Sequence, residues 1–372
     1  MVTVEELETD PHPALAALRP VGWVEALQGW VVAGRELAMA VLRDPETFTV
    51  DDPRFSTAQV VGPSMLSLDG AAHATHRDPF ESPFGLAETR RRFTEPVQQT
   101  VDDLVAAIRP TGAADIRRTV AGPLSVAVVA YSLGLPPASA ATVLDWYTDI
   151  SDSVSGVAAG RPVTADGAAA FAQLHAHVAS GIDSADSLIA TAAHAGLGVD
   201  EVVANAAVLM FGGIETTEGM ITNALWYLLN HPGELDAVLA DRSLLPNAIE
   251  ESLRLEPAAA VVDRYATRDV ELAGASIRRG DYVVVSLAGA GRDPAVFPSP
   301  DDFDVRRSNA RRHLAFASGP HICLGMHLTR LETLVAVDAV LRLPGLRLAP
   351  GSPPPRGLVF RKPSALNVLW DA

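Results

Sequence analysis

Residues 316–325 read FASGPHICLG and include Cys323, the only cysteine in a chain of 372 residues. A lone cysteine is usually a small, buried, unreactive side chain. Here it lies between two glycines and two residues after a histidine, and the helical spacing of apolar residues resumes soon after it. This context indicates a cysteine with a chemical role.

Several kinds of site could use such a cysteine. A structural zinc site needs four nitrogen or sulfur ligands, and His313, His321 and His327 are the nearby candidates, without the paired cysteines typical of such sites. A cysteine protease receives little support, because no family-specific signature surrounds Cys323. Covalent haem attachment needs a second cysteine. The remaining chemistry is a thiolate bound axially to haem iron, which promotes O–O bond cleavage.

The neighbours of Cys323 suit a thiolate beside a haem. Gly319 and Gly325 let the backbone approach a flat macrocycle, and glycine also permits the positive φ of a tight turn. Phe316 can pack beside the edge of the ring. A helix that begins just after Cys323 would direct its first N–H groups and the positive end of its dipole toward the sulfur, which stabilises a thiolate.

Apolar spacing predicts a mainly α fold with small β-sheets. Within residues 71–255 the apolar positions recur mostly at helical spacing. The segment 199–233 is apolar on most sides, which predicts a long central helix that stops before Pro232. Gly212 and Gly213 cost this helix about 1 kcal/mol each relative to alanine, so some function must require the missing side chains.

Short β-like segments precede and follow the helical body. Residues 21–34 predict a hairpin around Gly29, and residues 261–290 contain further short β-like runs, the last of them over residues 282–289. Residues 291–322 are rich in Pro, Arg and Gly and predict a long ordered loop before the last helix. Because no repeat or long linker divides the sequence, we expect one domain over residues 1–372.

Composition excludes several classes of protein. Hydrophobic residues make up 48% of the chain and charged residues 20%, as in globular proteins. The net charge of −16 repels phosphate backbones and anionic lipid, so nucleic acid is not an expected partner. The longest apolar stretch, residues 202–214, is too short to span a membrane, and the acidic N-terminus is unlike a signal peptide. A single cysteine forms no intrachain disulfide, so the expected location is the cytoplasm.

Phe316, Gly319, His321, Cys323 and Gly325 resemble the haem-binding signature of the cytochrome P450 family in its soluble bacterial form. The resemblance covers nearly the whole chain. It implies the fold of that family, in which a long central helix lies over a haem and a loop supplies the cysteine ligand. It also implies haem b (iron protoporphyrin IX) as cofactor, with Cys323 as the metal ligand.

Two positions depart from the family pattern. Ala317 stands where glycine is usual, which is the smallest available change. Gly291 replaces the usual asparagine before Arg292-Asp293-Pro294, and the sequence does not predict the consequence.

Glu251 and Arg254 match the Glu-x-x-Arg pair of the family. Alone, an i,i+3 pair is a weak signal, because such pairs occur on many surface helices and contribute roughly a few tenths of a kcal/mol. The resemblance implies a buried pair completed by a second arginine before the haem signature. Arg307 is the preferred candidate for this structural triad, and Arg306 is the less favoured one.

Gly212, Glu215 and Thr216 resemble the oxygen-activation motif of the family. The resemblance implies that Gly212 leaves room for dioxygen. Oxygen activation consumes two protons, which a carboxylate and a hydroxyl in an apolar helix can deliver. Glu215 and Thr216 are therefore the predicted catalytic residues. The alternative is that both side chains only hydrogen-bond to nearby backbone, as threonine often does in helices.

The resemblance also implies contacts between cationic or donor side chains and the haem propionates. His73 and Arg77 match a His-x-x-x-Arg motif, although a surface i,i+4 pair would look the same. Arg264 and His313 match further propionate positions, and His321 belongs to the haem signature.

By resemblance, the chain is a haem-thiolate monooxygenase that inserts one oxygen atom of O2 into a small apolar substrate. The expected role is tailoring of a bacterial secondary metabolite by a monomeric enzyme. Electrons would come from a separate ferredoxin and its reductase, because one cysteine cannot hold an iron–sulfur cluster. A basic cluster could receive that donor, and it comprises Arg306, Arg307, Arg311 and Arg312.

Two alternatives stay open. A peroxide-driven enzyme of the same fold would need neither ferredoxin nor the acid–threonine pair, and a haem-binding or sensing module would catalyse nothing. The presence of Glu215 and Thr216 argues against both. Family positions also predict an apolar substrate pocket, although core packing would explain its members equally well; they are Val60, Val61, Met65, Leu66, Val261, Val262, Val359 and Phe360.

Overall fold

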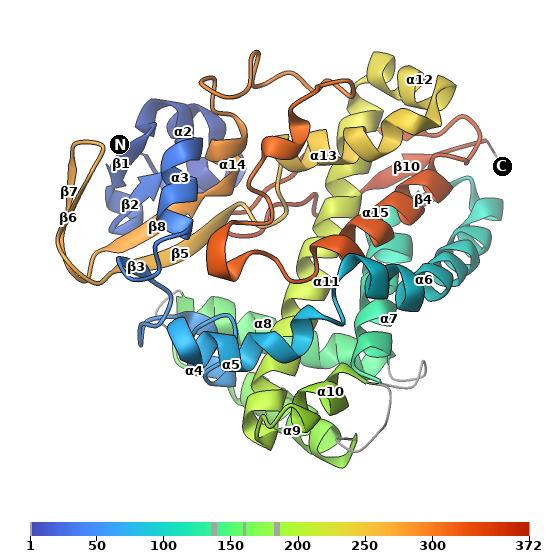
Figure 1. Cartoon of the computed structure of the whole chain (residues 1–372). Coiled ribbons are helices and arrows are strands. Elements are labelled where there is room, and N and C mark those ends of the chain that lie inside the picture. The colour runs from blue at the N-terminus through green and yellow to red at the C-terminus, as the bar shows by residue number, and fades with distance from the viewer. Residues whose placement is uncertain (1, 135–139, 159–160, 182–186, 372) are drawn as a thin grey trace. The chain divides into compact units, whose positions relative to one another are not determined.

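The computed structural model describes residues 2–134, 140–158, 161–181 and 187–371 (Figure 1). The chain forms two compact units, which are described one at a time. The first unit comprises Met1–Thr49, Val97–Gly122 and Glu215–Ala372, and the second comprises Val50–Pro96 and Pro123–Ile214. Two long helices, α6 and α11, contribute residues to both. One functional domain over residues 1–372 stays a prediction.

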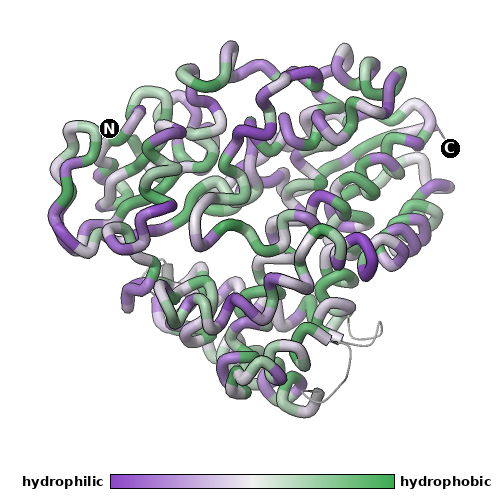
Figure 2. Tube along the Cα trace, viewed as in Figure 1, coloured by the Kyte–Doolittle hydropathy of each residue, from purple (hydrophilic) through white to green (hydrophobic). Residues whose placement is uncertain are grey.

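Most of the described chain is helical, as the apolar spacing predicts. The helices are α1 (Val4–Thr9), α2 (His12–Leu18), α3 (Arg35–Leu42), α4 (Ser56–Val61), α5 (Gly70–Glu81), α6 (Leu86–Ile108), α7 (Gly122–Ser132), α8 (Ala140–Ala158), α9 (Ala165–Gly181), α10 (Leu188–His194), α11 (Val199–Asn230), α12 (Pro232–Ala240), α13 (Leu245–Leu255), α14 (Leu287–Gly291) and α15 (Met326–Val340). Figure 2 shows hydrophobic and hydrophilic residues interspersed along α6, as in a helix that has one apolar and one polar face.

The strands are short and belong to the first unit. They are β1 (Val21–Val24), β2 (Gly29–Val32), β3 (Phe48–Thr49), β4 (Ala113–Asp115), β5 (Val261–Ala266), β6 (Val270–Leu272), β7 (Ala275–Ile277), β8 (Tyr282–Ser286), β9 (Arg347–Leu348) and β10 (Asn367–Leu369). They form a five-stranded sheet in the order β1-β2-β8-β5-β3, a three-stranded sheet in the order β4-β10-β9, and the hairpin β6-β7. The predicted hairpin around Gly29 is confirmed as the antiparallel pair β1-β2.

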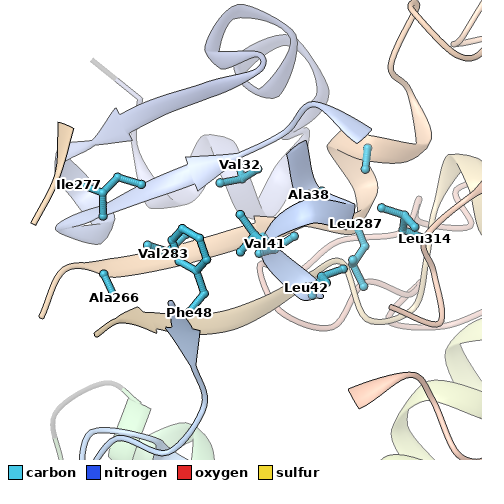
Figure 3. Close-up of a cluster of buried hydrophobic side chains, with 12 residues drawn as sticks. Val32, Ala38, Val41, Leu42, Phe48, Ala266, Ile277, Val283, Leu287 and Leu314 are labelled. Carbon is cyan, nitrogen blue, oxygen red and sulfur yellow. The ribbon is translucent and has the colours of Figure 1, made fainter. Parts of the chain in front are cut away.

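The five-stranded sheet buries apolar side chains on both faces. Along β8, Val283 and Val285 point into one cluster, and Val284 points into another on the opposite face, as strand alternation requires. Figure 3 shows the first cluster, in which Val41 and Leu42 of α3 cover the sheet. The parallel pairing of β2 with β8 joins the N-terminal hairpin to strands from the last third of the chain.

One predicted β segment ends earlier in the structure. The sequence predicts a β-like run over residues 282–289, but β8 stops at Ser286 and the short helix α14 follows. The physical reason is a helix N-cap: the Ser286 hydroxyl accepts the Gly289 N–H at 3.0 Å. The predicted loop over residues 291–322 is confirmed, with only short 3-10 turns at Ala310–Arg312 and Gly319–His321.

The second unit is built from helices around a buried amide. α8 packs against α9 and α4, and α5 packs against α10. Asn205 of α11 is fully buried: its Oδ1 accepts the Met65 N–H at 2.8 Å, and its Nδ2 lies 3.0 Å from Nδ1 of His76 in α5. These hydrogen bonds compensate for burying a polar side chain in an apolar helix.

The long helix predicted from segment 199–233 is confirmed as α11, which ends at Asn230. His231 leaves the helical backbone angles, with φ −123° and ψ 77°, because the residue before a proline avoids them, and Pro232 begins α12. No helix within the described ranges combines the length and the hydrophobicity needed to cross a bilayer.

Candidate active site

Main-chain hydrogen bonds shape the loop that leads to Cys323. The Cys323 N–H donates to the Phe316 carbonyl at 2.8 Å, and the Ala317 N–H donates to the Leu314 carbonyl at 2.7 Å. α15 begins at Met326, three residues after the half-buried thiol, as predicted. Because these contacts use backbone atoms, the loop closes independently of the cysteine side chain.

The small residues of this loop are present for different structural reasons. Gly319 has a φ of +77°, and an added Cβ would lie 2.5 Å from the Leu42 carbonyl oxygen at the end of α3. Protein packing therefore already requires this glycine, without a macrocycle. At Gly325 an added Cβ would make an ordinary contact with Thr329, at 3.8 Å. Ala317 has a φ of +58°, which glycine adopts with less strain, so its replacement of glycine changes more than side-chain size.

The predicted Glu-x-x-Arg triad is confirmed. Glu251 and Arg254 are both fully buried, and two hydrogen bonds of 2.7 Å join their side chains in a bidentate pair. Arg307 Nε donates to Glu251 Oε1, also at 2.7 Å. Arg306, the less favoured choice, has a side chain that is 60% exposed and lies 4.0 Å from Glu234. The triad ties α13 to the loop before Cys323.

A second buried network, which no sequence motif predicts, begins at the neighbouring Glu250. His313 Nε2 lies 2.9 Å from Glu250 Oε2, and His313 Nδ1 accepts the Ala315 N–H at 3.1 Å. Both ring nitrogens are therefore used by protein groups in this structure. The contact of His313 with a propionate stays a prediction. Arg330 donates to both oxygens of Glu250, at 2.7 and 3.0 Å, and lies 4.4 Å from the centre of the Phe316 ring.

The electrostatics of this network match its hydrogen bonds. Burial alone would raise the pKa of Glu250, but hydrogen bonds from His313 and Arg330 lower it to about 2. Burial lowers the pKa of His313, and its hydrogen bond to Glu250 opposes this only in part. At neutral pH the carboxylate is ionised and the imidazole is neutral, with its proton on Nε2. The adjacent glutamates in EESLR were the available signal for this network.

The middle of α11 combines a gap with a polar pair. At Gly212 an added Cβ would meet nothing within 4 Å, whereas at Gly213 it would lie 2.7 Å from Val129 of α7. The two glycines therefore have different surroundings: there is open space beside Gly212, whereas Gly213 packs closely against the neighbouring helix. Glu215 and Thr216 follow within about one turn, and both are half-buried.

Comparison with known proteins identifies the family. A family model described as Cytochrome P450 matches residues 172–360. Cytochrome P450 monooxygenase PikC of Streptomyces venezuelae is 34% identical, over 98% of this chain and 92% of its own length. The chain belongs to the cytochrome P450 family. Nocardicin C N-oxygenase of Nocardia uniformis subsp. tsuyamanensis is 33% identical, over 97% of this chain and 96% of its own length. The solved structure of CalO2 superposes with a TM-score of 0.91 at 29% identity, over 100% of this chain and 99% of CalO2.

This P450 is therefore an enzyme of the monooxygenase class, and its family implies a haem-thiolate cofactor. The residues around Cys323 fit that group. The loop carries the chain's only thiol among apolar side chains that protein covers incompletely, such as Ile322, which is 37% exposed. Cys323 would hold the iron through Sγ.

The remaining propionate predictions fall in separate units. His73 and Arg77 are buried on one face of α5, and Arg77 donates to Glu81 at 3.0 Å. In the other unit, Arg264 is buried on β5 and donates to the Asp263 carbonyl at 2.6 Å, and His321 is half-buried. Their convergence on a cofactor stays a prediction for this P450.

The predicted substrate residues have mixed surroundings. Val60, Val61 and Met65 are buried in the second unit, where Leu66 is half-buried. On β5 of the first unit, Val261 and Val262 pack against clusters on opposite faces of the sheet, so they cannot both face one pocket.

The last two substrate candidates belong to a turn near the C-terminus of the first unit. Val359 is 42% exposed, and its carbonyl accepts the Ala260 N–H at 2.8 Å. Phe360 is half-buried and forms an isolated antiparallel bridge with Ala259. The turn thus lies beside the residues that lead into β5. Whether it contacts substrate stays a prediction.

Close packing explains why this chain has glycine at position 291, where the family usually has asparagine. Its carbonyl accepts a hydrogen bond from Arg254 at 2.8 Å, and an added Cβ would lie 1.9 Å from the Arg254 carbonyl oxygen. We expect Gly291→Ala to destabilise this P450 by about 3 kcal/mol, because backbone held by a buried triad cannot move aside. Urea-induced unfolding measures the change.

Gly233→Ala is the matched control for this prediction. Gly233 lies in α12, and an added Cβ would meet nothing within 4 Å. There, alanine should stabilise the protein by up to about 1 kcal/mol through its higher helix propensity. Equal unfolding midpoints for Gly291→Ala and the wild-type protein would contradict the packing argument.

Proposed function

We propose that this P450 inserts one oxygen atom of O2 into an apolar small molecule during tailoring of a bacterial secondary metabolite. The observation that supports this most directly is the arrangement in α11, where the half-buried Glu215 and Thr216 follow the open side of Gly212. A carboxylate and a hydroxyl at such a gap suit delivery of protons to a reaction site. The enzyme would act as one domain over residues 1–372.

The proposed roles of the chain's residues follow from their chemistry. Haem b, when bound, would supply the oxygen-activating chemistry, and a thiolate from Cys323 would favour O–O cleavage. Thr216 would hold a proton at its hydroxyl for transfer toward the reaction site. Glu215 would take protons from solvent water and pass them on. Apolar side chains would exclude other water from the substrate.

The names of relatives support the substrate class. The Nocardia uniformis relative is named for N-oxygenation of nocardicin C, and another relative, from Streptomyces avermitilis, is named pentalenic acid synthase. We infer a small organic molecule for this P450 as well. The class of oxidation follows from the family, whereas the position of oxygen insertion depends on the pocket.

We further propose that electrons come from a separate ferredoxin and its reductase. The single cysteine cannot hold an iron–sulfur cluster, so the chain needs an external donor. Three arginines near the Cys323 loop have exposed side chains in an acidic protein; they are Arg306, Arg311 and Arg312. This patch would attract an acidic donor. Arg307, a predicted member of the patch, is instead buried in the triad.

Thr216→Ala tests the oxygen-activation role. We expect product formed per reducing equivalent to fall about 10-fold, with the balance released as hydrogen peroxide, because the hydroxyl that directs protons is lost. Haem content and the spectral response to substrate should stay at wild-type levels. Product, peroxide and consumed NAD(P)H are measured in the same reaction with ferredoxin and reductase.

The neighbouring threonine supplies a matched control. Thr217 is buried, and its hydroxyl lies 3.4 Å from the Thr329 hydroxyl, so Thr217→Val should leave the coupling of electrons to product unchanged. Thr216→Ser keeps the hydroxyl and should retain most of the coupling. Full coupling in Thr216→Ala would discredit the proposed role, and turnover driven equally well by hydrogen peroxide alone would favour the peroxide-driven alternative.

A further inference from the structure

Lys362 is the only lysine in the chain, and its ammonium group lies against Glu215. The Lys362 Nζ to Glu215 Oε1 distance is 2.7 Å, and the same nitrogen forms an ion pair with Glu218, one turn further along α11. All three side chains are largely buried, with exposed fractions of 12 to 13%. Ion pairs that water screens so little interact more strongly than surface pairs.

The two glutamates differ in the cations that contact them. Glu218 also pairs with Arg117, at 3.2 Å, so two cations contact its carboxylate. Gly122 makes room for this carboxylate, because an added Cβ there would lie 3.0 Å from Glu218 Oε1. Lys362 would therefore keep a charged partner if Glu215 moved away. This lowers the free energy needed to separate Glu215 from the lysine, since the buried charge of the lysine would not be left unpaired.

The turn that carries Lys362 is firmly attached to α11. The adjacent Arg361 donates to Glu256 at 2.5 Å, and Asn223 of α11 donates to the Arg361 carbonyl at 2.9 Å. Lys362 itself forms a main-chain bridge with Arg356, with two hydrogen bonds of 3.2 Å. The backbone on both sides of the ion pairs is thus held in place by hydrogen bonds.

We propose that Lys362 is a positioning residue for Glu215, holding its carboxylate aside through their ion pair, and that Glu218 retains the lysine whenever Glu215 turns to transfer a proton. The inference rests on the relay role proposed for Glu215. In this arrangement Glu215 takes up a proton from a solvent hydronium ion, which becomes water. The neutral carboxyl group is no longer attracted to Lys362 and moves. After giving the proton up, the carboxylate is attracted back to the ammonium group.

Kinetics of Lys362→Met test the proposal. We expect kcat to fall about 10-fold with a larger solvent isotope effect, because Glu215 is no longer positioned, while KM and the spectral response to substrate stay unchanged. Lys362→Arg keeps the charge and should restore most of kcat. Arg356→Met is the matched control: it removes an exposed cation from the same turn and should behave as wild type.

The Glu218→Gln variant tests whether Glu218 and Glu215 share Lys362. If Glu218 retains Lys362 during proton transfer, this substitution should hold Lys362 on Glu215 and also lower kcat. Unchanged kcat in Glu218→Gln would overturn the shared arrangement. In the double variant Glu215→Gln/Lys362→Met, the loss should equal that of Glu215→Gln alone, because both act at one step.

The outcomes separate this inference from the proposed function. Wild-type kinetics in Lys362→Met together with an impaired Glu215→Gln would overturn the role of Lys362 and leave the relay standing. Wild-type coupling and isotope effect in Glu215→Gln would instead remove the relay on which the inference rests.

A spectroscopic measurement tests the ion pair without turnover. Because the chain has one lysine, 15N-lysine labelling gives a single side-chain Nζ resonance. We expect this resonance in the haem-loaded protein to shift in Glu215→Gln and in Glu218→Gln, and to stay in place in Glu271→Gln, which changes an exposed carboxylate elsewhere. A resonance that neither Glu215→Gln nor Glu218→Gln moves would show that the contact is absent in solution.

Discussion

Cys323→Ser is expected to lose the red-shifted absorption of sulfur-ligated haem under carbon monoxide and to abolish monooxygenation. Serine keeps the size of the side chain but supplies no thiolate at neutral pH, so the electron donation that favours O–O cleavage disappears. No other thiol in the chain can replace it. The reduced, carbon monoxide-treated difference spectrum is the measurement, followed by product analysis.

The fold should survive the Cys323→Ser substitution. The loop is closed by the Cys323 N–H, which donates to the Phe316 carbonyl, and this bond does not involve the side chain. Circular dichroism should therefore match that of the wild-type protein. Ile322→Ala is a suitable control, because it alters the neighbouring side chain and retains the thiol. A wild-type carbon monoxide spectrum in Cys323→Ser would refute Cys323 as the metal ligand.

Arg254→Leu is expected to destabilise the protein by about 4 kcal/mol. Its guanidinium is fully buried and forms the bidentate pair with Glu251, so its removal leaves a buried carboxylate supported mainly by Arg307. Arg254 also donates to three main-chain carbonyls of the loop before Cys323, those of Gly291, Pro300 and Asp302. Each carbonyl would lose a charge-assisted hydrogen bond.

Urea-induced unfolding of the haem-loaded protein measures this effect. A loss of about 4 kcal/mol is a large share of the stability of a typical domain, so we expect a low yield of Arg254→Leu. Arg254→Lys provides a milder test: it keeps the charge, loses the planar fork, and should cost about half as much. Arg306→Leu removes an exposed arginine of the same loop and should change stability by less than about 0.5 kcal/mol. Comparable effects of Arg254→Leu and Arg306→Leu would contradict the triad.

Much of the architecture was predictable from local patterns. α11 and α15 follow from apolar spacing and from Pro232, and the β1-β2 hairpin follows from alternation around Gly29. The sheet order was not predictable. β2 pairs in parallel with β8 across most of the chain length, and alternation within either strand says nothing about its partner.

The site likewise contains residues that the sequence could predict and residues whose contacts it could not predict. Glu251, Arg254 and Arg307 could be assigned because their spacing matches a family motif. The hydrogen bond between His313 and Glu250 could not be predicted, because a motif names a residue but does not specify which groups its ring nitrogens meet, and Glu250 lies 63 residues away along the chain. The packing reasons for Gly213, Gly291 and Gly319 were likewise invisible, since each involves backbone or side chains of another segment.

Sequence alone established the lone thiol, the helix after it, the glycine gap and the acid–threonine pair, because each depends on residues close together in the chain and on the periods of helix and strand. Folding was needed to bring Lys362 to Glu218, 144 residues away, and to divide the two neighbouring glutamates of α13 between separate buried networks. The physical reason is that burial, and with it the strength of an ion pair, is set by every segment that excludes water from a position. No local stretch of sequence contains that information.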